Sequence, residues 1–225
     1  VMYSPNTNGL KLSSSGQNDE GGRSQALIRA YNNTIVNAGW RRDGVKGGGI
    51  YVEKNALVSV FNNLLVNCKF KAMTPSWGIP NDPEEGYADA SVIDYNFYAS
   101  GASESTLDQD IANGTTTSFL GYTSNNEDYN PAAVDIHSVV SASAGDEATN
   151  PMFINFPYMN NPLDAYVYDN SWDFHVAANS PVLKNAYSGN DAKMQSYFGA
   201  SGLTVNGQTY TSPAVQAWFG AFGAN

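Results

Sequence analysis

The sequence has a single cysteine, few charged residues and no long apolar run, and each shortage excludes a class of protein. Cys68 has no second cysteine with which it could form an intrachain disulfide. Charged residues make up 14% of the chain, and 11 basic residues face 21 acidic ones, which gives a formal net charge of −10. This balance argues against nucleic acid and anionic membranes as partners, because both require a basic surface. No apolar stretch reaches the roughly 18 residues of a membrane-spanning helix, so none is predicted.

Familiar catalytic motifs are also scarce. The two histidines, His137 and His175, lie far apart in apolar stretches, and no Ser-His-Asp arrangement or glycine-rich phosphate loop stands out. We expect His175 to have a structural role within its alternating segment, residues 173–176. Cys68 directly follows an asparagine-containing repeat, and this position favours a small buried hydrophobic residue over a reactive thiol.

The most informative feature of the sequence is a repeat built around paired asparagines. Residues 31–37 (YNNTIVN) recur thirty positions later as residues 61–67 (FNNLLVN), and residues 94–98 (DYNFY) form a weaker third copy. The first two copies are each preceded by an apolar segment. A period of roughly 20–50 residues is typical of a solenoid or an array of units.

Each repeat is interpreted as a strand, a tight bend and a second strand. A hairpin would also place asparagines at the turn, but the long period favours a parallel β-helix, in which each coil stacks on the one before. Asparagine tolerates the left-handed backbone conformation that such a bend requires. We therefore predict that Asn33, Asn63 and Asn96 stack roughly 4.8 Å apart, with their side-chain amides joined in a hydrogen-bonded ladder.

The segments YNNTIVN, GGGIYV and VFNNLLVNCK resemble the coils of the pectate-lyase-like superfamily of right-handed parallel β-helices. Residues 150–186, which include NPMFIN and SWDFHVAANSPVLKNA, resemble the segment that closes many secreted bacterial members. The resemblance covers about residues 9–187. It implies an all-β, single-stranded right-handed parallel β-helix with irregular loop insertions, located outside the cell or on its surface, with a polysaccharide or oligosaccharide as partner. It does not select an activity, because lyases, hydrolases, esterases and non-catalytic binding proteins share this architecture.

The expected domain organisation is one solenoid with a cap. We expect coils over residues 1–188, interrupted by long loops at residues 74–90 and 101–131, and a C-terminal capping segment at residues 189–225. The cap is expected to cover the open end of the solenoid, because terminal coils expose strand edges, and a short helix is predicted at residues 213–219. Three or four recognisable coils are few for this superfamily, which suggests the C-terminal portion of a longer β-helix.

One outward-facing column of side chains provides the candidate catalytic residues. Residues 10–12, 50–53 and 68–73 are expected to stack as one parallel sheet, which the resemblance implies is the floor of a polysaccharide groove. Lyases of this architecture abstract a proton next to a uronate carboxylate with a lysine or arginine base. The alternative is that these are ordinary solvent-exposed lysines on a strand face. The expected column is Lys11, then Tyr51 with Glu53, then Lys69 or Lys71, and the candidate bases are Lys71, Lys11 and Lys69.

Residues on and beside this sheet are candidates for substrate binding. Tryptophan and tyrosine stack on sugar rings, while a few polar groups fix the orientation of the sugar. The alternative is that each aromatic side chain folds over the edge of a coil. The candidates are Trp40, Arg41, Arg42, Tyr51, Glu53, Trp77 and Tyr87.

An acidic loop provides candidate metal ligands. Carboxylate oxygens suit calcium, which neutralises the substrate carboxylate in lyases, although the spacing here is not that of an EF-hand loop. A solvated acidic loop is the alternative. The candidate ligands are Asp82, Glu84, Glu85 and Asp89, and calcium is the only cofactor that the sequence suggests.

Three functions stay open on the sequence alone. The first is a polysaccharide lyase that acts on a uronate-containing glycan, and the second is a non-catalytic glycan-binding surface protein. The third is a structural or adhesive solenoid without a small ligand. A lyase predicts that the candidate lysines lie close to one another and to the acidic loop, whereas a binding protein predicts that Trp40 and Trp77 are coplanar on one surface.

Overall fold

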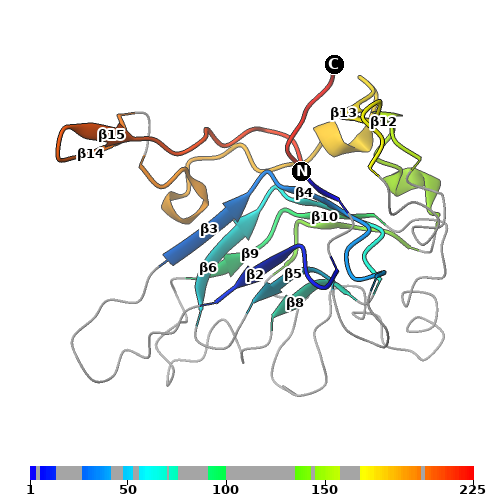
Figure 1. Ribbon diagram of the computed structural model, residues 1–225, viewed down its shortest axis with the longest axis horizontal. Coiled ribbons are helices and arrows are strands. Elements are labelled where there is room, and N and C mark those ends of the chain that lie inside the picture. The colour runs from blue at the N-terminus through cyan, green and yellow to red at the C-terminus, as the bar shows by residue number, and fades with distance from the viewer. Residues whose placement is uncertain are drawn as a thin grey trace.

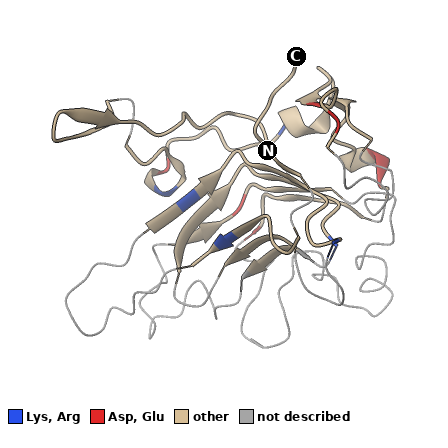
Figure 2. Ribbon diagram, in the orientation of Figure 1, with Lys and Arg blue, Asp and Glu red and all other residues tan. Residues whose placement is uncertain are grey.

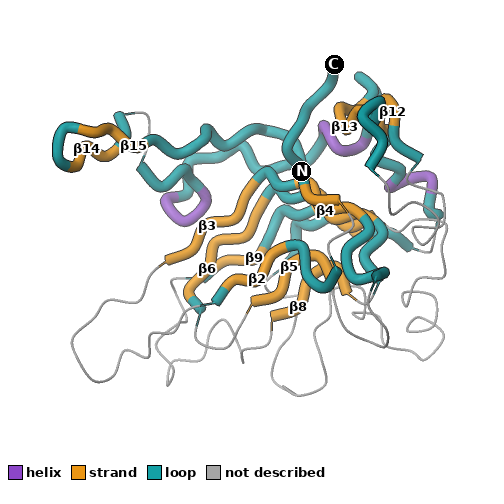
Figure 3. Tube along the Cα trace, viewed as in Figure 1, coloured by secondary structure: helices purple, strands orange, loops and turns teal. Residues whose placement is uncertain are grey.

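The computed structural model describes the repeat region and much of the C-terminal part of the chain (Figure 1). These residues form β-strands, three single-turn 3₁₀ helices and connecting segments, and they include no α-helix (Figure 3). None of these helices is long and apolar enough to cross a membrane. The predicted loops lie outside the described residues, apart from positions 74 and 75. The described residues are 1–3, 6–13, 27–41, 48–52, 56–69, 71–75, 91–99, 135–142, 145–157, 168–198 and 201–225.

Three parallel sheets form the body of the protein, and successive strands of the chain enter them in rotation (Figure 1). The first sheet contains β1 (Met2–Tyr3), β4 (Thr34–Val36), β7 (Leu64–Val66), β10 (Phe97–Ala99) and β11 (Val139–Val140). The second contains β2 (Leu10–Leu12), β5 (Gly48–Val52) and β8 (Lys71–Pro75). The third contains β3 (Leu27–Tyr31), β6 (Leu57–Phe61) and β9 (Val92–Ile93). The predicted all-β fold with parallel strands is confirmed.

The hydrophobic core lies between the three sheets. β-Branched residues suit pleated strands because they pack well against their neighbours, and Val58 and Val60 on β6 show the pattern, each with no exposed surface. Burying a side chain of this size contributes about 1.5–3 kcal/mol to stability. The other sheets send Ile35, Ile50, Val52, Leu65 and Met73 into the same core, each at most 1% exposed.

The three middle strands of the first sheet, β4, β7 and β10, are buried on both faces. Leu65 points into the central core, whereas Leu64 and Val66 pack into a second apolar cluster on the opposite face. That second cluster includes residues from an antiparallel pair of strands, β12 (Phe153–Asn155) and β13 (Asp173–Val176). The C-terminal part of the chain therefore covers the outer face of this sheet.

Residues with a left-handed backbone conformation form the bends between the strands of the third sheet and those of the first sheet. Asn32, Asn62 and Tyr95 occupy equivalent positions and have φ angles of 51°, 53° and 52°. Asparagine takes this conformation more readily than other non-glycine residues, which explains the predicted bends in the first two repeats. Asn37 and Asn67, with φ angles of 56° and 51°, form the next corner in the same way.

The predicted asparagine ladder is confirmed. Nδ2 of Asn33 donates to Oδ1 of Asn63, and Nδ2 of Asn63 donates to Oδ1 of Asn96, both at 2.9 Å. The ladder ends at Ser138, whose hydroxyl accepts the backbone N–H of Asn96 at 2.7 Å. The ladder thus provides partners for amides that would otherwise be buried without hydrogen bonds.

The C-terminal segment runs along the outside of the corner that the left-handed bends form. Nδ2 of Asn32 donates to the carbonyl of Trp218 at 2.7 Å, and Nδ2 of Asn62 donates to the carbonyl of Gln216 at 2.9 Å. The predicted helix at residues 213–219 is wrong. These carbonyls accept hydrogen bonds from asparagine side chains, and the segment is irregular, with bends at residues 217–220.

An exposed hairpin extends from this segment and forms the arm at the upper left of Figure 1. It consists of β14 (Leu203–Val205) and β15 (Gln208–Tyr210), paired antiparallel. Asn206 and Gly207 both have positive φ angles, 51° and 80°, as a tight two-residue hairpin turn requires.

Cys68 is 2% exposed, which confirms its predicted burial, and this burial raises the pKa of its thiol to about 12 from an ordinary value of 9.0. Above about pH 9 the unfolded chain loses this proton while the folded chain keeps it. The free energy of unfolding should therefore fall as the pH rises from about 9 toward 12, by roughly 1.4 kcal/mol per pH unit.

Urea unfolding of the wild type and Cys68→Ala across this pH range measures the effect. Tyrosines ionise in the same range in both proteins, so the difference between the two curves isolates the thiol. Parallel curves would contradict the prediction.

Candidate functional site

The second sheet contains the predicted groove floor, but only part of the predicted column. The register pairs Lys11 with Tyr51 and Tyr51 with Thr74. The prediction that Lys69 or Lys71 comes next in this column is wrong. Lys71 instead pairs with Gly48 at the start of β8, and Lys69 lies in the corner before β8, where its N–H donates to the carbonyl of Ala38. The alternating pattern of residues 68–73 therefore spans a corner and the beginning of a strand.

The basic residues of the described chain are spread over separate elements rather than gathered in a strip (Figure 2). Lys11 is exposed on β2, and Arg29 lies on β3. Arg41 is exposed in the corner after Asn37, beside Trp40. Nε1 of Trp40 donates to the carbonyl of Asn67 at 2.7 Å, which ties the Trp40 side chain to the next repeat.

Several predicted site residues lie outside the described part of the chain. The description of Lys71 covers its backbone only. Within the described residues, no group of three or more histidine, cysteine or acidic side chains could hold a metal ion. The predictions that fall outside the described residues concern Arg42, Glu53, Trp77 and Tyr87 for substrate binding and Asp82, Glu84, Glu85 and Asp89 for calcium.

The two histidines lie in different environments. Nδ1 of His137 lies 2.6 Å from Oδ2 of Asp94, and the backbone N–H of His137 donates to Oδ1 of the same carboxylate at 2.8 Å. The His137 ring stacks on Tyr95 with a centroid separation of 4.3 Å and an interplanar angle of 7°. These contacts attach the segment before β11 to the third repeat. His175 instead borders an open pocket.

This pocket, with a volume of about 590 Å³, is the candidate functional site. Trp172 forms its aromatic centre, with ring centroids 4.8 Å from Tyr3 and 5.6 Å from Tyr168. Tyr168 is 53% exposed, so its ring is available to a ligand. The lining residues are Val1, Tyr3, Tyr168, Trp172, Asp173, Phe174, His175 and Phe222.

A carboxylate and an imidazole form the polar side of the pocket. The backbone N–H of His175 donates to Oδ1 of Asp173 at 2.9 Å, and Nδ1 of His175 lies 2.6 Å from the same oxygen. These two hydrogen bonds, the backbone one first, lower the pKa of Asp173 below its ordinary value. Because an ionised carboxylate can only accept hydrogen bonds, Nδ1 of His175 is the donor in the second one. The Asp173 carboxylate can therefore accept further hydrogen bonds from ligand hydroxyls.

Sequence reasoning missed this pocket because its walls come from distant parts of the chain. Tyr3 lies near the beginning of the sequence and Phe222 near its end, and the His175 ring packs on Phe222 with centroids 4.6 Å apart. The only local signal was the alternation in residues 171–176, which places Trp172 and His175 in one short segment.

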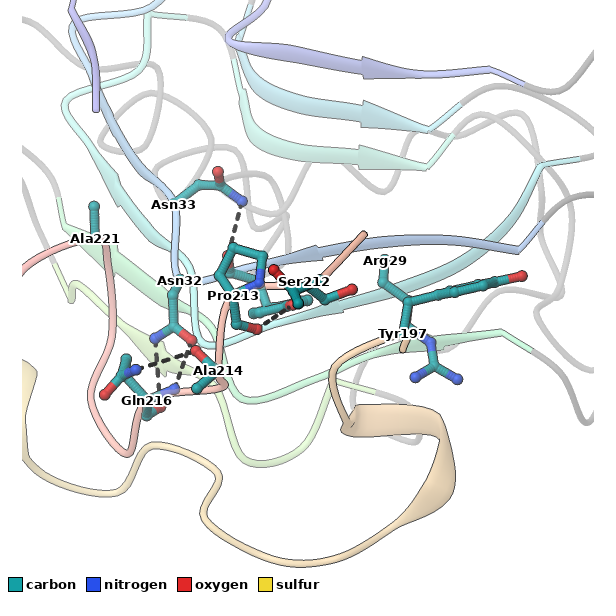
Figure 4. A pocket seen from close by; sticks show the side chains of 11 residues that line it. Arg29, Asn32, Asn33, Tyr197, Ser212, Pro213, Ala214, Gln216 and Ala221 are labelled. Carbon is teal, nitrogen blue, oxygen red and sulfur yellow. Dashed lines mark hydrogen bonds between the residues drawn. The ribbon is translucent and has the colours of Figure 1, made fainter. Parts of the chain in front are cut away.

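A second pocket, of about 560 Å³, lies between β3 and the C-terminal segment (Figure 4). Arg29 borders it, and its guanidinium donates to the carbonyls of Gln195 at 2.7 Å and Ala192 at 3.1 Å. The guanidinium carbon also lies 5.3 Å from the centroid of the Tyr197 ring. Arg29 is thus engaged in holding the C-terminal segment, including η4 (Ala192–Met194), against the third sheet.

Scans of protein-family models, of curated proteins and of solved structures each found no match to this chain.

Proposed function

We propose that the three parallel sheets are the faces of a right-handed parallel β-helix of the pectate-lyase-like kind. The rotation of successive strands among the sheets supports this interpretation, because each coil of such a helix adds one strand to each face. The stacked left-handed bends and the amide ladder support it further, because they align equivalent positions of neighbouring coils.

We propose further that this is a secreted or cell-surface protein that binds a neutral glycan in the aromatic pocket. The observation that carries the proposal is the exposed Tyr168 ring beside the Asp173 carboxylate and the His175 ring. A sugar presents an apolar face of C–H groups, which stacks on an aromatic ring, and a rim of hydroxyls, which donate to a carboxylate. The net charge of −10 disfavours a polyanionic glycan at this site.

A polysaccharide lyase is the second candidate. The observation that favours it is the exposed Lys11 next to Tyr51 on the second sheet, the face where such a groove is expected. In this reading Lys11, Lys69 or Lys71 is the base, and calcium bound by the acidic loop neutralises the uronate. The register weakens this candidate, because Thr74 rather than a lysine follows Tyr51 in the column.

Substitution of Tyr168 by alanine tests the glycan-binding proposal. We expect affinity for a neutral oligosaccharide to fall about tenfold or more, because the stacking surface is lost. Affinity electrophoresis against a panel of neutral polysaccharides would identify a ligand, and calorimetry would give its affinity. Tyr210→Ala is the matched control, because Tyr210 is similarly exposed, 47% against 53%, and lies on the hairpin rather than in the pocket.

Each outcome separates the candidates. If both substitutions weaken glycan binding equally, or if no neutral glycan retards the protein, the proposal that the pocket binds a neutral glycan is wrong. An increase in ultraviolet absorbance during incubation with a uronate polysaccharide and calcium would indicate an unsaturated product, and loss of that increase in Lys11→Ala would favour the lyase.

A further inference from the structure

The rings of the aromatic pocket form a corner rather than a flat platform. The Trp172 ring is inclined by 71° to that of Tyr3 and by 77° to that of Tyr168. The Tyr3 and Tyr168 rings are inclined to each other by 62°, and their centroids lie 6.4 Å apart. A sugar ring stacks on one aromatic plane, whereas three steeply inclined planes surround a compact group. The geometry therefore suits a small, rounded group beside a sugar that stacks on the exposed Tyr168 ring.

The side chains beside this corner carry negative charge. The described residues that line the pocket include no lysine or arginine, and Asp173 is the only carboxylate among them. The backbone N–H of His175, and then its ring, lower the pKa of Asp173 by hydrogen bonding, so this carboxyl is ionised near pH 7. Both hydrogen bonds end on Oδ1, and Oδ2 accepts none from any described residue. One carboxylate oxygen is thus available to a positively charged donor in the pocket.

The aromatic faces favour the same kind of ligand. The face of a tryptophan or tyrosine ring attracts a cation that lies within about 6 Å of its centroid, and clusters of such rings bind alkylated ammonium ions. An ammonium group is compact, and its C–H groups contact the rings while its charge faces the carboxylate. The net charge of −10 also attracts cations toward the protein. Shape and charge therefore agree on an ammonium group.

We propose that the pocket binds a sugar that carries an ammonium group more tightly than the same sugar without it. The ammonium group lies among the rings of Tyr3, Tyr168 and Trp172 and beside Oδ2 of Asp173. This inference rests on the glycan-binding function proposed above and names the group that the pocket selects on the sugar. Stacking on Tyr168 does not need the charge, so a neutral sugar also binds, but more weakly.

The first test isolates the charge with two molecules of the same shape. Choline carries a permanent positive charge, and neohexyl alcohol is its neutral counterpart, in which a carbon atom replaces the nitrogen. We expect titration of the full chain near pH 7, followed by NMR, to show that choline binds about tenfold more tightly than the alcohol. Equal affinities, or no binding of choline, would overturn the proposal.

Two substitutions locate the attraction. Asp173→Asn keeps the shape of the side chain and removes its charge, so we expect choline to bind about threefold more weakly or worse and the alcohol to bind as before. Glu147→Gln is the matched control, because Glu147 is exposed on η2 (Glu147–Thr149), does not line the pocket and loses the same charge. If both substitutions weaken choline equally, the net charge of the chain attracts it and the proposed site is wrong.

A comparison of glycans separates this inference from the glycan-binding proposal itself. Each neutral polysaccharide of the affinity-electrophoresis panel is compared with an aminated form, in which primary amines replace part of the hydroxyls. Such amines, like that of lysine, are protonated near pH 7. Stronger retardation by an aminated form, lost in Asp173→Asn but kept in Glu147→Gln, supports the inference. Equal retardation by both forms leaves the glycan proposal in place and refutes the preference for ammonium, whereas binding of choline without retardation by any polysaccharide refutes both.

Discussion

Replacing Asn63 by alanine is expected to lower the free energy of unfolding by about 3 kcal/mol or more. Asn63 has no exposed surface and lies in the middle of the ladder. Its Oδ1 accepts the backbone N–H and Nδ2 of Asn33, and its Nδ2 donates to the carbonyl of Ala30 and to Oδ1 of Asn96. Alanine would remove all four of these hydrogen bonds and deprive the backbone N–H of Asn33 of this acceptor, and a buried polar group that loses its partner costs about 1–3 kcal/mol.

Urea denaturation of wild type, Asn63→Ala and Asn33→Ala measures the effect. Asn33 is the matched control because it has the same neighbours in the repeat but occupies the end of the ladder, where its Oδ1 accepts nothing from the described residues. We expect its substitution to cost less than half as much. If both substitutions cost the same, the stability of the fold does not depend on the continuity of the ladder.

Replacing Asn62 by alanine is expected to cost about 3 kcal/mol and to release the C-terminal segment. Nδ2 of Asn62 donates to the carbonyls of Tyr187 and Gln216, both at 2.9 Å, and its Oδ1 accepts the N–H of Tyr187 at 2.8 Å. Alanine removes all three bonds and also takes a φ of 53°, which costs roughly 1–2 kcal/mol for a residue with a Cβ. The N–H and carbonyl of Tyr187 would be left without these partners.

Two further substitutions separate the causes. Asn62→Gly removes the hydrogen bonds but tolerates the positive φ, so the difference between glycine and alanine measures the backbone strain. Asn206→Ala is the exposed control, since Asn206 has a similar φ of 51° on the hairpin turn and no role in holding the segment. Limited proteolysis should cleave the C-terminal segment faster in both Asn62 variants than in Asn206→Ala. Equal cleavage rates would show that Asn62 does not hold the segment.

Local signals in the sequence predicted the repeating part of this fold well. The paired asparagines located the bends, the strands on either side and the ladder, because left-handed conformation and amide pairing both depend on residue type at one position. Tyr95 shows the limit of that signal. It occupies the third bend with a φ of 52° although tyrosine rarely adopts it, because the stacking of the neighbouring repeats fixes the backbone there.

The candidate site was harder to predict because it depends on long-range packing. The alternation of Lys69 and Lys71 predicted that both side chains lie on one strand face. The corner that begins at Asn67 includes Lys69, however, and β8 pairs with β5 so that Thr74 is next to Tyr51. The path of the C-terminal segment was missed because asparagine side chains more than 150 positions away accept and donate its hydrogen bonds. The aromatic pocket joins both ends of the sequence, and no window of neighbouring residues contains that information.

The spacing of the ladder residues also determines where this protein can change during evolution. Successive rungs are 30, 33 and 42 positions apart in sequence, yet they are joined by hydrogen bonds of similar length. Extra residues between rungs therefore leave the hydrogen bonds of the ladder intact, and lengthening a loop adds little entropic cost. Insertions that bring new surface chemistry can accumulate at the other corners, while a single inserted residue at an asparagine bend would displace every strand that follows.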